Sequence, residues 1–187
     1  MQTNDSTPYI TFEHLFITRS LYANAYFIAR STASPINLPF VRAGICMSLA
    51  ILTASVLPLY LTLFSSFIIP MVGICFFILL TIFFMFILPC VVKGQGAKIF
   101  DSNKLIELPF TISLFKSFFE ISNEKETIRQ YWTEVDRSLE TSDMFVILGG
   151  KQRPLLLIEK QQLTNEQQNS LSSFLQKMLA YKHKKIT

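Results

Sequence analysis

The chain contains few residues that could carry acid–base or metal chemistry, and these residues are widely separated. Its two histidines, His14 and His183, lie near opposite ends of the 187-residue sequence. Neither has a carboxylate or cysteine at the short spacings that are typical of metal sites. Solvated or helix-capping imidazoles explain both histidines. We therefore expect no metal ion, no cofactor and no catalytic histidine.

Acidic residues gather in one stretch, and paired carboxyl groups are a common device for acid–base catalysis. The acidic residues of this stretch are Glu120, Glu124, Glu126, Glu134 and Asp136, and the interleaved basic ones are Lys125, Arg129 and Arg137. Mixed charges of this kind are typical of a solvated β-hairpin face. Phosphate-binding, dinucleotide-binding, serine-hydrolase and zinc-protease motifs are absent from the sequence. The sequence therefore predicts a protein that is not an enzyme.

Two features could contact a partner instead. Lys151 and Arg153 follow the pair Gly149-Gly150, so a turn would carry two cations at its tip. Such a tip suits phosphate headgroups, although solubilising charges on a turn are the simpler interpretation. Trp132 is the single tryptophan, and we expect strands over 126–132 and 139–148 to bury it against a closing helix. An exposed binding anchor is the alternative role for this ring.

These residues are arranged around a long hydrophobic stretch, residues 43–92, which contains no Lys, Arg, Asp, Glu or His. A bilayer core needs about 20 apolar residues per helix, so the stretch has room for two crossings and a turn. A break from Ser65 to Pro70 predicts helices near 43–64 and 70–92. The three cysteines all lie inside this stretch, where thiols behave as small apolar groups. A hairpin buried in a soluble protein is the alternative, but the flanking parts are too small to enclose it.

Charge predicts the orientation of this hairpin. Arginines precede the first predicted helix, lysines follow the second, and the turn between them carries no charge. The positive-inside rule then places both termini in the cytoplasm and the turn on the far side. We therefore expect a multi-pass protein of the bacterial inner membrane. The net charge of +4 is too small and too dispersed to predict nucleic-acid binding.

The segments outside the hairpin divide the chain into an N-terminal segment, residues 1–42, and a domain over residues 97–187. Thr11 could cap a helix that runs to about Ala29, with an aromatic stripe. This helix would lie on the membrane surface or pack on the C-terminal domain, and the sequence does not favour either. Gly94 and Gly96 would loosen the chain after the hairpin.

The C-terminal domain reads as short strands followed by one helix. Strands are expected over 108–115, 117–122, 128–132, 139–141, 144–148 and 154–158, the last two joined by the Gly-Gly turn. Thr164 and Gln167 have the form of a capping box that begins a closing helix. The Tyr181–Lys185 tail reads as a solvated helix end. Antiparallel strands closed by one helix predict an α+β roll with the element order of a pleckstrin-homology-like (PH-like) domain.

The layout and several short segments resemble the YcxB-like family of bacterial membrane proteins. The resemblance is carried by the two-helix hairpin and by residues 108–113, 131–135, 145–147 and 157–160. Trp132, Glu134 and Val135 match the family's Trp-x-acid-aliphatic pattern loosely, whereas Glu159 stands where the family usually has proline. The resemblance implies a cytoplasmic PH-like domain on a membrane hairpin and no catalytic residues.

Two functions are consistent with these observations. The first is a non-enzymatic membrane protein whose cytoplasmic domain binds lipid headgroups or a protein partner, with self-association also open. The second is an immunity protein that neutralises a membrane-inserting bacterial toxin by packing on it within the bilayer. Recognition in the bilayer would use the aromatic pairs of the hairpin, which are Phe76, Phe77, Phe83 and Phe84.

Overall fold

The chain folds into two compact units. A computed structural model describes residues 7–64, 66–103, 106–150 and 153–186, without the side chains of 63, 64 and 153. One unit is Arg30–Gln95, and the other combines Met1–Ala29 with Gly96–Thr187. The expected N-terminal segment, residues 1–42, is therefore divided between the two units. Its first part belongs with the C-terminal domain because it supplies a strand and a helix to that domain's core.

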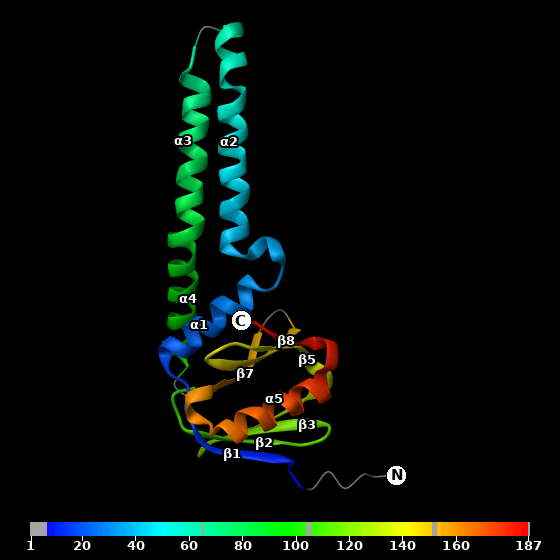
Figure 1. The fold of residues 1–187 in the computed structure, drawn as a ribbon. Coiled ribbons are helices and arrows are strands. Elements are labelled where there is room, and N and C mark those ends of the chain that lie inside the picture. Colours follow the sequence, from blue (N-terminus) through cyan, green and yellow to red (C-terminus); the bar gives the residue numbers. More distant parts are fainter. Residues whose placement is uncertain (1–6, 65, 104–105, 151–152, 187) are drawn as a thin grey trace. The chain divides into compact units, whose positions relative to one another are not determined.

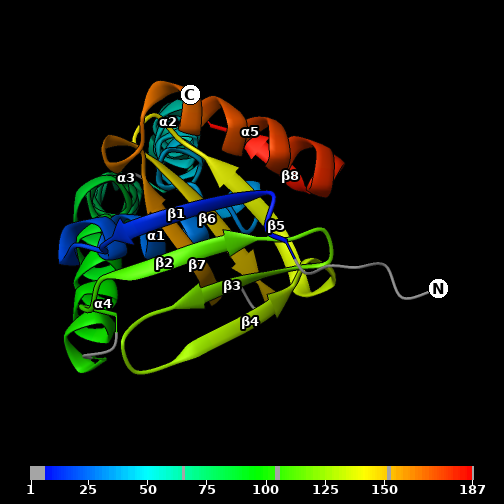
Figure 2. The same cartoon turned by 90° about the horizontal axis from the view of Figure 1, so that it is seen from below.

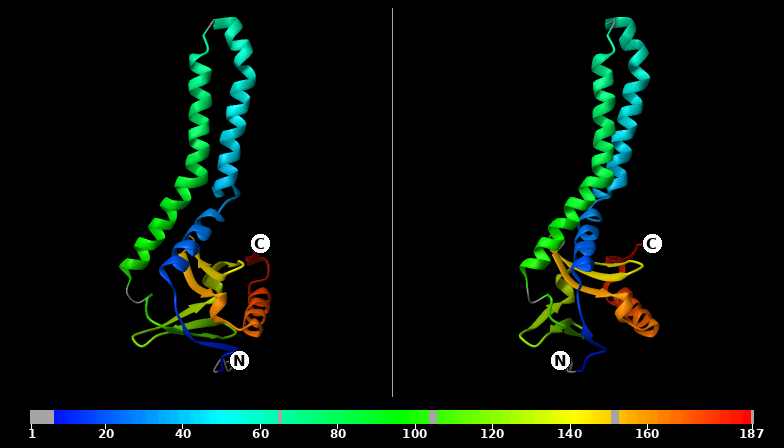
Figure 3. Two further views of the ribbon diagram at one scale, coloured as in Figure 1. Left: turned by 60° about the vertical axis from the view of Figure 1, so that its left-hand side comes forward. Right: turned by 90° about the vertical axis from the view of Figure 1, so that its left-hand side faces the viewer.

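The Arg30–Gln95 unit is a helical hairpin. Helix α2 spans Pro39–Phe64 and α3 spans Ile68–Ile82, and the two run antiparallel, side by side (Figures 1 and 3). The predicted pair of long apolar helices with a break after residue 64 is confirmed. Gly73 of α3 lies at the contact with α2: a Cβ added there would meet Thr53 Cγ2 at 3.6 Å, an ordinary van der Waals distance.

The second long helix continues further than expected. After α3 the chain forms a π-helical turn over Phe83–Ile87 and then α4, Leu88–Ser102. Pro89 has no backbone N–H and would clash with the carbonyl four residues earlier in a regular α-helix. The wider π turn just before it accommodates this defect. Gly94 and Gly96 lie inside α4, so the expected loosening of the chain at these glycines is wrong.

The other unit contains two four-stranded sheets and two further helices (Figure 2). Sheet A has the order β1-β2-β3-β4, all antiparallel, with bounds Ile10–Leu15, Phe110–Leu114, Phe118–Ser122 and Thr127–Tyr131. Sheet B has the order β7-β6-β5-β8, with bounds Arg153–Glu159, Met144–Gly149, Val135–Glu140 and His183–Lys185. The strand pairs predicted on either side of Lys116 and of the Gly-Gly turn are confirmed.

Strand β6 of sheet B is buried on both faces. Phe145 and Ile147 point into the core between the two sheets, which helix α5, Asn165–Leu179, closes on one side. Val146 and Leu148 point the other way, into a second core against helix α1, Arg19–Ser31. A strand covered on both faces needs a continuous apolar run rather than an alternating one, which is what residues 144–148 provide.

The N-terminal segment differs from the expected helix beginning at Thr11. Residues 10–15 form strand β1, which pairs with β2 and places Phe12 opposite Ile112. The strand has an irregularity between Phe12 and Leu15, where His14 has a positive φ of 54°. This bulge brings Phe12 and Leu15 to the same buried face although they are three residues apart. A spacing of three resembles a helical repeat, which explains the wrong prediction.

Helix α1 packs in the domain core. Leu21, Ala25 and Ala29 recur every fourth residue and contact the outer face of sheet B. The sequence left open whether this helix lies on the membrane surface or packs on the C-terminal domain, and in the structure it packs on the C-terminal domain.

The C-terminus combines a confirmed and a wrong prediction. The Thr164 capping box is present, since its hydroxyl accepts from the Gln167 N–H and the Gln167 side chain accepts from the Thr164 N–H. The tail, however, is not a solvated helix end. Ala180 has a φ of 42°, which ends the helix, and residues 183–185 form β8, a parallel partner of β5.

Candidate functional site

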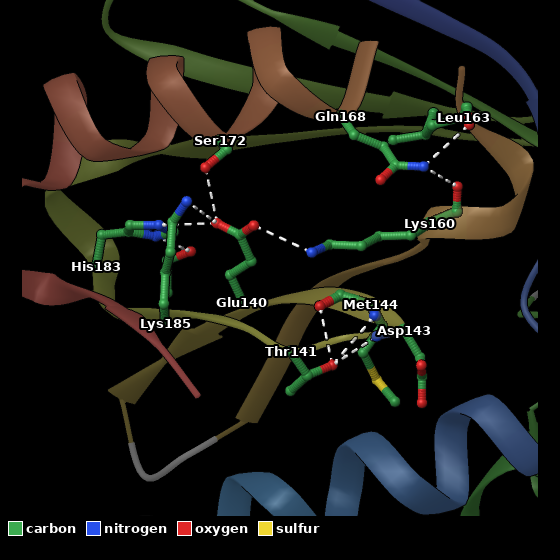
Figure 4. Close-up of polar contacts among 11 residues, drawn as sticks. Glu140, Thr141, Asp143, Met144, Lys160, Leu163, Gln168, Ser172, His183 and Lys185 are labelled. Atoms are coloured by element: carbon green, nitrogen blue, oxygen red, sulfur yellow. Dashed lines mark hydrogen bonds and ion pairs between the residues drawn. The ribbon is translucent and has the colours of Figure 1, made fainter. Parts of the chain in front are cut away.

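The most concentrated group of polar side chains in the described residues surrounds Glu140, at the end of β5 (Figure 4). Ser172 reaches the carboxylate from α5, Lys160 from the turn after β7, and His183 and Lys185 from β8. We call these five residues the Glu140 cluster. The cluster joins elements that are distant in sequence, so it exists only in the folded domain.

Each partner of Glu140 contacts the carboxylate directly. Ser172 Oγ donates to Oε2 over 2.7 Å, and Lys160 Nζ donates to Oε1 over 3.0 Å. Lys185 Nζ lies 3.5 Å from Oε2, and His183 Nε2 lies 3.3 Å from it without the alignment of a hydrogen bond. The Lys160 ammonium also lies 4.9 Å from the centre of the Phe145 ring. A buried carboxylate that is paired on both oxygens remains charged in the core.

The cluster shifts the pKa of both titratable groups at its centre. Burial alone raises the pKa of Glu140, but hydrogen bonds from Ser172 and Lys160 and the charges of Lys160 and Lys185 outweigh it, so the pKa is lowered. Burial lowers the pKa of His183, and the attraction of Glu140 only partly opposes this. The site therefore combines an ionised Glu140 with a neutral His183 at pH 7.

One part of this arrangement resembles the serine–histidine–acid constellation of hydrolases. Ser138 Oγ lies 3.2 Å from His183 Nδ1, while Glu140 lies against the other ring nitrogen. Nucleophilic catalysis also requires access of the substrate to the hydroxyl. Ser138 is completely buried within sheet B, and its hydroxyl has no exposed surface for attack. These contacts instead hold helix α5, the turn after β7 and strand β8 against strand β5.

A cavity of about 520 Å³ lies elsewhere in the same unit, between edge strands β4 and β7 and beside residues of α1 and α4. Its lining is mostly apolar and includes Ile121 and Ile128 from sheet A and Leu155 from sheet B. The polar lining residues are Asn103, Asn123 and Glu126. Its volume is within the range of small-molecule sites, about 300–1,000 Å³.

Glu126 is an exception among the acidic residues expected on a solvated hairpin face. Glu120 fits that expectation, since it pairs with Arg129 across β3 and β4 at 2.6 Å. Glu126 is half-buried, as Glu120 is, but it lines the cavity, and its carboxylate has no ion pair with any described side chain.

Trp132 lies in the core between the two sheets. Its ring packs on Phe119 and Phe174, with centroid distances of 4.9 and 5.6 Å, and its Nε1 donates to the Phe115 carbonyl over 2.9 Å. Because the side chain is buried and its one donor is paired, it is not an exposed anchor. Its role is packing against the closing helix.

The predicted basic tip cannot be described in the same way. Lys151 lies outside the described residues, and of Arg153 only the backbone, as the first residue of β7, is described. The headgroup-binding role of this tip stays a prediction.

The four predicted aromatic residues of the hairpin divide between two environments. Phe76 and Phe83 are exposed, whereas Phe77 and Phe84 are half-buried. Phe84 faces Arg42, whose guanidinium lies 5.8 Å from the ring centre. Phe76 contacts Phe77 and Phe83 contacts Phe84 edge to face. Within the part of the hairpin that the structure describes, Phe76 and Phe83 are the two of these rings open to a partner or to lipid.

Metal-binding geometry is not found in the described ranges. These contain no group of three or more His, Cys, Asp or Glu side chains that could hold an ion. Cys46, Cys75 and Cys90 are free thiols, and His14 is exposed on the β1 bulge.

Sequence reasoning missed the Glu140 cluster. No local pattern indicates it, because strands β5 and β8, helix α5 and the turn after β7 meet only in the fold. No protein-family model, no curated protein and no solved structure matches this chain. The similarity to YcxB-like proteins therefore stays a prediction.

Proposed function

We propose that this chain is an integral protein of the bacterial cytoplasmic membrane. Helix α2 and the helix beginning with α3 would cross the bilayer, and the sheet-containing unit would act on the cytoplasmic side as a non-catalytic, PH-like binding module. One observation carries the membrane assignment: the two long apolar helices leave their side chains uncovered. In their most hydrophobic windows, only 11% of the first helix and 0% of the second is buried.

A soluble protein would not expose such surfaces. The candidate spans are Pro39–Thr62 and Ile68–Ser102, and contiguous apolar surface of this extent leads to aggregation in water. In a bilayer the same surface contacts lipid chains, and α2 with its 26 residues is about 39 Å long, enough to cross a core of about 30 Å.

The polar side chains of the hairpin support the same assignment. Several of its hydroxyl groups donate to backbone carbonyls of their own helix. Ser48 donates to the Gly44 carbonyl, Thr53 to Leu49 and Thr81 to Phe77, over 2.8–2.9 Å. Polar groups satisfied within one helix can face lipid without an unpaired donor.

Cysteine accessibility would test this proposal. In a variant with the three native cysteines replaced by serine, Phe67→Cys places a thiol in the turn between α2 and α3, and Glu166→Cys places one on α5. A membrane-impermeant maleimide should label Phe67→Cys in intact spheroplasts, and Glu166→Cys only after lysis. Labelling of Glu166→Cys in intact spheroplasts, or release of the protein by alkaline carbonate, would contradict the proposal.

The immunity function stays an alternative prediction. Phe76 and Phe83 are exposed on the hairpin, but exposed rings suit lipid chains as well as a toxin helix. We therefore retain the binding module as the proposed function.

A further inference from the structure

We propose that the cavity between β4 and β7 binds a single-chain amphiphile with an uncharged, hydroxyl-bearing head, of the monoacylglycerol type. This inference rests on the proposed membrane location, which supplies such molecules. It adds to the proposed function the chemical class of ligand that the binding module takes.

The apolar part of the cavity would bind the acyl chain of the ligand. Ile121 and Ile128 are cross-strand partners on β3 and β4, and they face Leu155 of β7 across the space. Tyr22 and Tyr26 of α1 and Ile99 of α4 also line it. Ile128 is 46% exposed although it lines the cavity, so a chain can enter beside it. Binding of an acyl chain here would be favourable because it removes this open apolar surface from water.

The β3–β4 turn supplies the polar groups that would bind the hydroxyl-bearing head of the ligand. Asn123 Oδ1 accepts from the backbone N–H groups of Lys125 and Glu126, over 2.8 and 2.9 Å. These bonds hold the side chain in place and leave its NH₂ group as a donor. Glu126 supplies an unpaired acceptor from the same turn. One donor and one carboxylate acceptor match hydroxyl groups, whereas a carboxylate or phosphate head would be repelled by Glu126.

The source of the ligand follows from the chain itself. Ile99 belongs to the continuous helical run Ile68–Ser102, which is also the second candidate membrane span. Ile99 lies seven residues beyond the charge-free stretch 43–92, on the part of this helix that leads into the sheet-containing unit. This helix ties the cavity-bearing unit to the proposed crossings, so the lipids of that membrane are a ready source of the ligand. A water-soluble apolar metabolite would need no such connection.

Photo-crosslinking of the full chain tests this proposal. The protein is reconstituted into phosphatidylcholine vesicles with an acyl chain that carries a diazirine and bears a glycerol, a carboxylate or a phosphate head. Labelled peptides are identified by mass spectrometry. We expect the glycerol probe to label peptides that contain residues 121–128 and 154–157, and the two anionic probes to label them much less.

Two matched substitutions on one strand separate the cavity from the protein surface. Ile128→Trp fills the cavity and should reduce labelling roughly tenfold, since excluding even two methylene groups of a chain weakens binding by about that factor. Tyr131→Trp places the same ring on β4 outside the cavity lining and should leave the labelling unchanged. Glu126→Gln should allow the carboxylate probe to label as strongly as the glycerol probe does.

The outcomes distinguish the two proposals. Labelling of α2 and α3 peptides without the cavity peptides would overturn the proposal that the cavity binds an amphiphile, and would leave the membrane assignment intact. Labelling of the cavity peptides without α2 and α3 would overturn the membrane assignment alone. Equal labelling of the cavity by all three heads, or of Ile128→Trp and the unchanged protein, would overturn the amphiphile assignment.

Discussion

Lys160 Nζ lies 3.0 Å from Glu140 Oε1, and this pair joins the turn after β7 to the end of β5 inside the folded domain. Both side chains are largely buried, with 17% and 11% of their surfaces exposed. Removing one member of such a pair leaves the other charge buried without compensation, which is far more harmful than losing a surface ion pair.

Glu140→Gln should therefore destabilise the domain by about 3 kcal/mol, because Lys160 and Lys185 lose their counter-charge. Trp132 is the only tryptophan and lies in this domain's core, so its fluorescence reports the thermal unfolding of this unit. Glu124→Gln, which removes an exposed carboxylate, is the matched control and should change stability little. An equal loss in both variants would contradict the role of the Glu140 cluster.

Acidification should loosen β8 before it unfolds the domain. Burial lowers the pKa of His183 below its ordinary value of 6.5, so between the two values the unfolded chain binds more protons than the folded one. The contribution of neutral His183 to stability is therefore lost as the pH falls from 6.5 toward the folded pKa. The contribution of Glu140, whose pKa is also lowered, is present above 4.5 and is lost only at more acidic pH.

Hydrogen exchange of the Ile186 amide, which donates to the Glu140 carbonyl over 2.7 Å, would measure this loosening. Exchange at this amide should accelerate between pH 7.5 and 5.5 after correction for the intrinsic rate, and His183→Gln should remove the acceleration. His14→Asn is the control, since His14 is exposed and Asn tolerates its positive φ. An unchanged pH dependence in His183→Gln would show that another group titrates.

The N-terminal strand should contribute as much to stability as the rest of the core. Phe12 is fully buried between the sheets, so Phe12→Ala should cost about 3–5 kcal/mol. Phe16, four residues later, is 49% exposed, and Phe16→Ala should change stability by less than about 1 kcal/mol. Thermal unfolding of the two variants gives the comparison. Similar stability of both would place β1 outside the core and restore the division at residue 42.

Gly96 should be intolerant of any side chain. A Cβ at this position would lie 2.9 Å from Tyr26 Cβ and 3.1 Å from Ala23 Cα, so α1 and α4 would have to separate. Gly96→Ala should destabilise the domain by about 1–3 kcal/mol. Gly94 has no heavy atom within 4 Å of such a Cβ, so Gly94→Ala should gain up to about 1 kcal/mol from helix propensity. The same sign for both substitutions would contradict this close approach.

The sequence by itself determined the features that depend on local pattern and local chemistry. A charge-free run of two helix lengths, interrupted near Ser65, specifies two long apolar helices because the pattern needs no distant partner. The strand pairs β2–β3 and β6–β7 follow from short apolar runs separated by turn residues. The Thr164 cap follows from a four-residue motif.

Only the tertiary structure decided what depends on contacts between distant segments. Strand β1 forms because β2 offers it a pairing edge, and its bulge makes Phe12 and Leu15 look helical in the sequence. Strand β8 is specified in the same way by β5. The Glu140 cluster and the cavity beside Glu126 are assembled from four or more segments each. Their residues carry no signature in sequence, because strand pairing and side-chain burial are properties of the folded chain.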